Sequence, residues 1–156
     1  MGEVPNDKVL TSNCVCLPDD VPNHRDTDDI LSSNPHRLGH ALFLSESNKD
    51  TIRKIKIPIE ICPSSNMKTM GLTSLNKHPV VNTIMDTTPT SINTDDMVVF
   101  EICLSDEYWA ISQTCGWDIQ KAIQYVEQLV PQILDYSKIV RKSLIDKIEK
   151  FKNAMC

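Results

Sequence analysis

Residues 57–66 read IPIEICPSSN, an apolar run that contains one carboxylate and then breaks at a proline into small polar residues. Apolar residues on both faces of so short a run are typical of a parallel strand buried between helices. Two similar runs flank it: RLGHALFL at 37–44, expected to end as a strand near His40, and TSINTDD at 90–96, which ends in two acids. The sequence therefore predicts three strands, each followed by polar side chains.

Helical patterns alternate with these runs. The first, TDDILSSNPHR, has Thr27 as its expected N-cap and ends at Asn34-Pro35. A later one, SDEYWAISQTCG, has Ser105 as its expected N-cap and Gly116 as its stop. Other helices are expected at 48–56, 117–130 and 133–154, and a polar loop at 63–79. Alternating strands and helices predict an α/β fold with a parallel sheet, and such folds carry their chemistry at the carboxyl ends of the strands.

Composition narrows the class of protein. The 156 residues suit one domain, and the net charge of -5 without a basic block argues against nucleic-acid binding. No apolar run approaches the roughly 18 residues of a membrane span, and the N-terminus has no secretory pattern. The six cysteines form no C-x-x-C, so we expect a reduced, cytoplasmic protein. Cys62 and Cys103 are expected as buried small hydrophobes, whereas Cys14 and Cys16 offer a soft metal only one ligand pair.

Several polar residues at strand ends are candidates for chemistry. Asp95 and Asp96 can ligate a metal or hold a substrate donor, or simply form a solvated turn. His40 can serve as an acid, a base or a charge stabiliser, although a lone histidine is more often structural. Glu3 follows Gly2 in a tight turn and can shuttle protons if burial raises its pKa, although an N-terminal glutamate is normally exposed.

Glu60 is unusual because it lies inside an apolar strand and needs a partner there. We expect a structural ion pair with Arg37 or Lys68 rather than a catalytic role. Ser64 and Ser65 lack the G-x-S-x-G context of a nucleophile, and the chain has neither a P-loop nor a Rossmann glycine pattern.

The order of these motifs is more specific than any one of them. The chain reads GEVPN, NPHRLGHALFL, IPIEICPSSN, HP, SINTDD and LSDEY. From residue 1 to about 125 it resembles the adenosine/AMP deaminase family, and most of all the adenosine deaminase-like branch that acts on N-6-methyl-AMP. The resemblance implies that 1–156 is the C-terminal half of a (β/α)8 TIM barrel of the metal-dependent hydrolase type. In it, 105–156 are closing helices and 7–23 a loop insertion.

The resemblance also implies a reaction and a site. The family uses zinc to add water to C6 of a small-molecule purine nucleoside or nucleotide, and expels ammonia or an amine to leave the inosine product. Asp95 matches the zinc ligand and Asp96 the aspartate that holds the purine N7. His40 matches the histidine that orients the nucleophile. Glu3 matches the glutamate that protonates N1, and Gly2 the glycine whose backbone reaches the ring.

This sequence departs from the family pattern in its metal ligands. It contains no His-x-His, and the third zinc histidine would stand one residue before Met1, so three of the four protein ligands are missing. We therefore expect this chain to be inactive and poorly soluble without a missing N-terminal half-barrel. Ala41 stands where the family more often has glycine, a change expected to be tolerated.

Three alternatives stay open on the sequence. Asp20 fits the family spacing to the NPHRLGH motif better than Glu3 does, although the GEVPN motif favours Glu3 by residue identity. A non-catalytic purine-binding or regulatory fragment would use Asp96, His40 and Gly2 without turnover. A metal-dependent phosphoryl-transfer site built on the two adjacent aspartates ranks last, because no phosphate-binding loop accompanies it.

Overall fold

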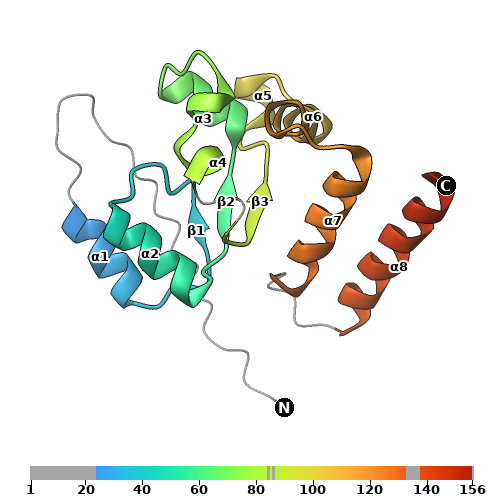
Figure 1. Cartoon of the computed structure of the whole chain (residues 1–156), viewed down its shortest axis with the longest axis horizontal. Coiled ribbons are helices and arrows are strands. Elements are labelled where there is room, and N and C mark those ends of the chain that lie inside the picture. Colours follow the sequence, from blue (N-terminus) through green and yellow to red (C-terminus); the bar gives the residue numbers. More distant parts are fainter. Residues whose placement is uncertain (1–23, 84, 86, 133–137, 156) are drawn as a thin grey trace.

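A three-stranded parallel sheet lies at the centre of the protein (Figure 1). The computed structural model describes residues 24–83, 85, 87–132 and 138–155. In sheet order the strands are β1 (Leu38–Gly39), β2 (Ile59–Ile61) and β3 (Thr90–Ile92). Leu38 pairs with Ile59, and Ile59 pairs with Thr90, in a parallel register. The three predicted strands and their parallel arrangement are confirmed, and the structure is a partial α/β fold.

Helices connect and follow the strands. Among the described residues, one helix precedes the sheet, namely α1 (His24–Ser32). The connections are α2 (Glu46–Ile55) between β1 and β2, and α3 (Pro63–Thr69), η1 (Leu75–Lys77) and α4 (Pro79–Thr83) between β2 and β3. After β3 come α5 (Met97–Phe100), α6 (Leu104–Cys115), α7 (Ile119–Leu129), η2 (Val130–Gln132) and α8 (Lys138–Met155). Within the described ranges, no helix is both long and apolar enough to cross a membrane.

The core forms where the apolar faces of the strands and helices meet. Ile52 of α2, Ile59 and Ile61 of β2, and Ile111 of α6 are each 0% exposed. Helix α7 contacts the edge strand β3, where the Tyr125 hydroxyl donates a hydrogen bond to the carbonyl of Thr90. Strand β2 is thus covered by side chains from several helices, as its doubly apolar sequence predicts.

The segment 63–79 corrects one prediction, because it is largely helical rather than a polar loop. Pro63 occupies the first turn of α3, where a missing N–H costs nothing. The next free N–H, that of Ser64, donates to the buried carboxylate of Glu107 on α6. The side chain of Ser74 accepts from the Asn76 N–H and starts η1. The polar residues of this segment therefore cap short helices.

Other predicted boundaries are partly wrong. Helix α1 begins at His24, so Thr27 lies within it and is not its N-cap. Helix α6 begins two residues earlier than predicted, with Cys103 as N-cap in place of Ser105. Its Asp106 carboxylate accepts from the Cys103 N–H and thiol, which leaves Cys103 exposed rather than buried. The predicted stop at Gly116 is confirmed, with φ of 65°.

Candidate active site at the strand ends

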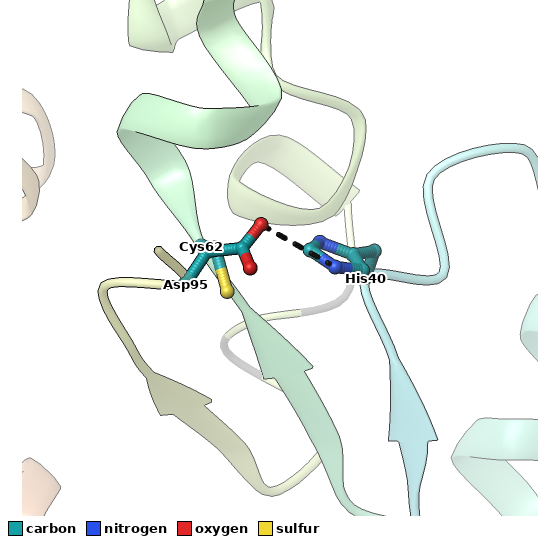
Figure 2. Close-up of side chains that lie close together, drawn as sticks. All are labelled: His40, Cys62 and Asp95. Atoms are coloured by element: carbon teal, nitrogen blue, oxygen red, sulfur yellow. Dashed lines mark ion pairs between the residues drawn. The ribbon is translucent and has the colours of Figure 1, made fainter. Parts of the chain in front are cut away.

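The carboxyl ends of the three strands bring His40, Cys62 and Asp95 together (Figure 2). His40 directly follows β1, Cys62 directly follows β2, and Asp95 lies in the turn after β3. One ligating atom from each lies within 4.8 Å of the other two. His40 Nε2 is 4.0 Å from Asp95 Oδ2. Parallel strands end at one edge of a sheet, which explains why residues far apart in sequence meet here.

The backbone is unusual at two of these positions. His40 has φ of 56°, Ala41 has φ of 50°, and Asp95 has φ of 61°. This left-handed region costs a non-glycine residue about 1–2 kcal/mol. A tight turn forms at His40, where the Ala41 N–H donates to the Gly39 carbonyl over 2.6 Å. Strained backbone of this kind is often retained where it aims a functional side chain.

Asp95 is held by a neighbouring hydroxyl. Ser65 Oγ donates a 2.7 Å hydrogen bond to Asp95 Oδ2. The Asp95 side chain is nevertheless 39% exposed, so the carboxylate can still reach a ligand. A carboxylate oriented by a second residue in this way is typical of metal ligands.

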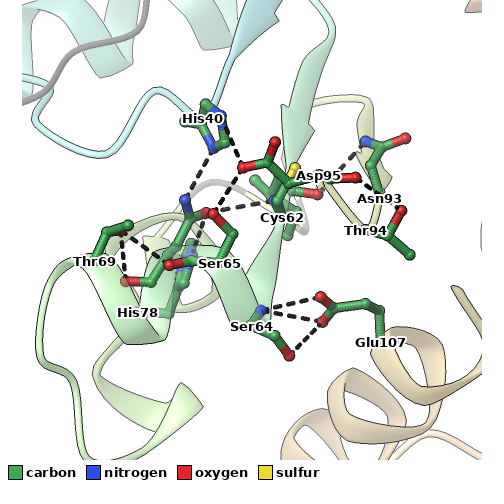
Figure 3. Close-up of polar contacts among 12 residues, drawn as sticks. His40, Cys62, Ser64, Ser65, Thr69, His78, Asn93, Thr94, Asp95 and Glu107 are labelled. Atoms are coloured by element: carbon green, nitrogen blue, oxygen red, sulfur yellow. Dashed lines mark hydrogen bonds and ion pairs between the residues drawn. The ribbon is translucent and has the colours of Figure 1, made fainter. Parts of the chain in front are cut away.

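His40 is held from its other ring nitrogen. Asn66 Nδ2 lies 2.9 Å from His40 Nδ1, and Asn66 Oδ1 lies 3.1 Å from Nε2 of the buried His78. Figure 3 labels the two histidines. The His40 side chain keeps 23% of its surface exposed. The Nε2 edge of the ring therefore faces Asp95, and the Nδ1 edge faces the protein.

Cys62 is buried, as predicted, and its thiol stays protonated at neutral pH. Burial raises its pKa to about 12, and the negative charges of Asp95, Glu107 and Glu60 add to this effect. The group that the strand ends place beside His40 and Asp95 is thus a neutral thiol. Sequence reasoning read Cys62 only as a hydrophobe, and its position right after a strand was the signal that placed it at the site.

The turn at the start of α3 supports both site residues. Ser64, Ser65 and Asn66 are consecutive, and Ser64 is fixed by Glu107, which is 0% exposed. The Ser64 N–H and Oγ each donate to the Glu107 carboxylate over 3.1 Å. Burial raises the pKa of Glu107, and the Ser64 hydrogen bonds partly oppose that shift. Sequence reasoning gave Ser65, Asn66, His78 and Glu107 no role, although the motifs PSSN, HP and LSDEY contain them.

The remaining predicted residues lie elsewhere. Asp96 is the N-cap of α5, where its Oδ1 accepts from Val98 N–H at 2.9 Å and Val99 N–H at 3.0 Å. Within the described ranges, the cluster of possible metal ligands comprises His40, Cys62 and Asp95, so Asp96 stands outside it. Gly2, Glu3, Asp20, Cys14, Cys16 and the segment 7–23 lie outside the described residues.

The predicted structural pair of Glu60 is confirmed. Arg37 Nη1 donates to Glu60 Oε1, and Arg37 Nη2 reaches the Gln132 carbonyl at 3.4 Å. The alternative partner, Lys68, instead donates to the Phe100 carbonyl at 2.9 Å. Glu60 is thus balanced inside β2 by a neighbour from the start of β1.

The donor set fits zinc in part. Imidazole nitrogen, thiol sulfur and carboxylate oxygen are all zinc ligands in proteins. However, burial raises the pKa of the Cys62 thiol to about 12 in the absence of a metal, and the hydrogen bond to Asn66 leaves His40 only Nε2 for a ligand. The described residues therefore offer a metal one well-oriented carboxylate, Asp95, rather than a complete set of ligands.

A parallel sheet with polar side chains gathered at its strand ends is the arrangement in which α/β proteins place their functional sites. The family model "Adenosine deaminase" matches residues 27–151. The chain belongs to the adenosine deaminase family.

Two relatives illustrate the match. The chain is 34% identical over 111 residues to the N6-mAMP deaminase of Arabidopsis thaliana, covering 71% of this chain and 30% of that protein. It is 31% identical over 94 residues to an adenosine deaminase of Clostridium botulinum strain Kyoto, covering 58% of this chain and 28% of that protein. The chain thus spans about a third or less of the length of these curated relatives.

Solved structures agree. An Arabidopsis N6-mAMP deaminase matches with a TM-score of 0.77 and 26% identity, over 83% of this chain and 39% of that one. Arabidopsis ADAL complexed with IMP matches with a TM-score of 0.77 and 25% identity, over 83% of this chain and 38% of that one. The described fold is thus similar to part of an adenosine deaminase-family enzyme.

Proposed function

We propose that this chain contributes the carboxyl-terminal part of the active site of a zinc-dependent hydrolase that deaminates adenosine or an adenosine monophosphate, N-6-methyl-AMP included. The observation that carries the proposal is the meeting of His40 and Asp95 at the strand ends, within a segment that matches the adenosine deaminase family. Both are residues that the motif order assigns to the site. The product is the corresponding inosine compound.

Each proposed role follows from the position of the residue. Asp95, oriented by Ser65, supplies one zinc ligand. Zinc, when bound, lowers the pKa of water to about 7 and so provides a nucleophile at neutral pH. His40 faces the same space and orients the nucleophile through Nε2. Asp96 holds the purine N7, and its Oδ1 accepts the hydrogen bonds from the first turn of α5.

Two residues outside the described ranges complete the proposed chemistry. Glu3 protonates the purine N1, and the backbone at Gly2 approaches the ring. Protonation of N1 lets water add to C6 without building a full negative charge on the purine. The remaining zinc ligands are expected from a partner half-barrel, because the sequence contains no His-x-His.

The purine nucleotide class is the favoured substrate. A structure similar to this chain has IMP bound, a second has GMP bound, and the relative with 34% identity is named an N6-mAMP deaminase. The adenosine deaminase of C. botulinum supports the unphosphorylated nucleoside as the competing substrate. We place the protein in the cytoplasm, and the free thiols of Cys62 and Cys103 support a reducing compartment.

The test uses the complete open reading frame that contains this chain, in parallel with the chain itself. The protein from the reading frame should bind one zinc and release ammonia from adenosine or AMP, or methylamine from N-6-methyl-AMP. The chain itself should show no turnover. If the protein contains no zinc and binds IMP without turnover, the proposed enzyme is replaced by a purine-binding protein. If the folded protein shows neither IMP binding nor turnover, both the enzyme and the purine-binding hypothesis are refuted.

A further inference from the structure

His78 and His40, both labelled in Figure 3, are linked through Asn66 by hydrogen bonds that run from the protein interior to the site. His78 is 0% exposed, and Asn66 is buried. Their hydrogen bonds determine which nitrogen of His40 carries a proton.

The series starts at two backbone N–H groups, for which donor and acceptor are unambiguous. The N–H groups of Val80 and Val81 lie 3.2 Å and 3.4 Å from His78 Nδ1. An N–H can only donate, so His78 Nδ1 accepts and carries no proton. Burial, with a smaller effect from His40, lowers the pKa of His78 to about 4, so the ring is neutral at physiological pH. Its one proton therefore lies on Nε2.

The orientation of the Asn66 amide follows from the proton on His78 Nε2. Its Oδ1 lies 3.1 Å from His78 Nε2 and also accepts from the Cys62 N–H at 3.4 Å. Turning the amide over would set its NH2 group against two donors, so the carbonyl must face inward. The Nδ2 group therefore donates to His40 Nδ1 over 2.9 Å. His40 Nδ1 accepts, and the proton of the neutral ring lies on Nε2.

We propose that Asn66 and His78 are positioning residues that fix His40 as the Nε2–H tautomer, so that His40 presents a proton donor toward Asp95 and is not a metal ligand. The Nε2 lone pair that a metal would need is used by the proton. His40 Nε2 and Asp95 Oδ2 lie 4.0 Å apart, so the two face one space without a direct hydrogen bond. The consequence for deamination rests on the proposed function, but the tautomer itself does not.

The test reads the tautomer directly by long-range proton–nitrogen NMR on the 15N-histidine-labelled full chain, without metal or substrate. The chain has four histidines, so H24Q, H36Q and H78Q identify three of the signals and leave that of His40. Wild type should show a pyridine-type Nδ1 and a pyrrole-type Nε2 for His40. A pyrrole-type Nδ1 would overturn the proposal. Because the readout needs no turnover, it separates this inference from failure of the proposed deaminase activity.

Asn66→Asp supplies the decisive variant, because a carboxylate only accepts. His40 must then donate from Nδ1, which frees Nε2 for a metal. The tautomer should reverse, and Cd²⁺ affinity of the chain should rise at least about tenfold, as expected for a changed orienting partner. Asn153→Asp, an exposed position on α8 with the same change of charge, should alter neither. An unchanged tautomer in folded N66D would overturn the proposal, and if N66D fails to fold, the wild-type spectrum still decides.

Discussion

Asp95 and His40 each depend on a polar neighbour in the first turn of α3. Ser65 donates to the carboxylate of Asp95, and Asn66 donates to the ring of His40. Two consecutive residues of α3 thus orient side chains that follow two different strands, β1 and β3. Partners of this kind contribute to affinity and geometry without touching a substrate.

Ser65→Ala removes the hydrogen bond that orients the Asp95 carboxylate. We expect zinc affinity of the protein from the complete reading frame to fall about tenfold, because freely rotating carboxylates bind metals less well. Competition with a chromophoric chelator measures the change. Ser47→Ala, an exposed position in α2, is the matched control and should bind zinc as wild type does. Equal affinities for S65A and S47A would contradict the role given to Ser65.

The substitution Ala41→Gly tests whether the backbone turn at His40 is strained. At φ of 50°, Ala41→Gly relieves about 1–2 kcal/mol of left-handed strain but loses a buried methyl group and gains unfolded-state entropy. We therefore expect a free energy of unfolding within about 1 kcal/mol of wild type. Ala110→Gly in α6 has no strain to relieve and should lose about 1 kcal/mol or more. Urea denaturation compares the two, and equal losses would show that Ala41 is unstrained.

His78 makes the stability of the protein depend on pH. Its pKa is lowered from 6.5 to about 4, so the unfolded chain binds more protons than the folded one between these values. Stability should therefore fall as pH decreases from 6.5 to 4, by up to about 3 kcal/mol from this group. His78→Gln should flatten this part of the pH profile, whereas the exposed His36→Gln should not. An NMR titration that finds His78 protonated near pH 6.5 would contradict this account.

At the scale of elements, α3 is the support on which the site rests. Its first turn is capped from α6 by Glu107, whose carboxylate accepts from both the N–H and the hydroxyl of Ser64. This long-range contact fixes Ser65 and Asn66 relative to the strand ends. Helices α3 and α6 therefore act together in placing the site residues.

Glu107→Ala should destabilise the protein by about 2 kcal/mol or more, because it leaves the Ser64 N–H without an acceptor and opens a buried space. Glu46→Ala removes an exposed ion pair with Lys49 and should cost about 0.5 kcal/mol or less. Thermal and urea unfolding of the two variants provide the comparison. Similar losses for E107A and E46A would show that the contact between α3 and α6 contributes little.

The strands were the most predictable elements, because an apolar run such as IPIEI has few other stable environments. The segment 63–79 was not predictable as helix, since the acceptor that stabilises its first turn lies 43 residues away on α6. The predicted N-cap of α6 was wrong for a related reason. The Asp106 carboxylate accepts from the Cys103 N–H, and the helix therefore starts nearer the N-terminus than predicted. Short helices depend on such partners more than on their own propensity.

The site was also predictable only in part. His40 and Asp95 were identified because each follows a strand, and parallel strands end at one edge. Asn66 and His78 were missed because their importance lies in mutual hydrogen bonds, which cross 12 and 26 residues of sequence. Residue types and spacing indicate which groups are reactive, whereas the groups that orient them become visible only in the folded chain.

At the scale of the whole molecule, the described sheet has three strands, and the chain covers 39% or less of the solved structures that it matches here. The proposed activity therefore belongs to the protein that the complete reading frame encodes. We propose that the His40 and Asp95 pair provides one side of a zinc-dependent site in that protein. The described residues carry the orienting groups for that side.

The most direct measurement is the rate of methylamine release from N-6-methyl-AMP, and of ammonia release from AMP and adenosine, by that protein and its Asp95→Asn variant. The account predicts turnover of at least one of these substrates and a loss of about a thousandfold or more in D95N, because a metal ligand is removed. Asp146→Asn on α8 is the matched control and should retain wild-type rates. Turnover that survives in D95N, or a folded protein that deaminates none of the three, would contradict the account.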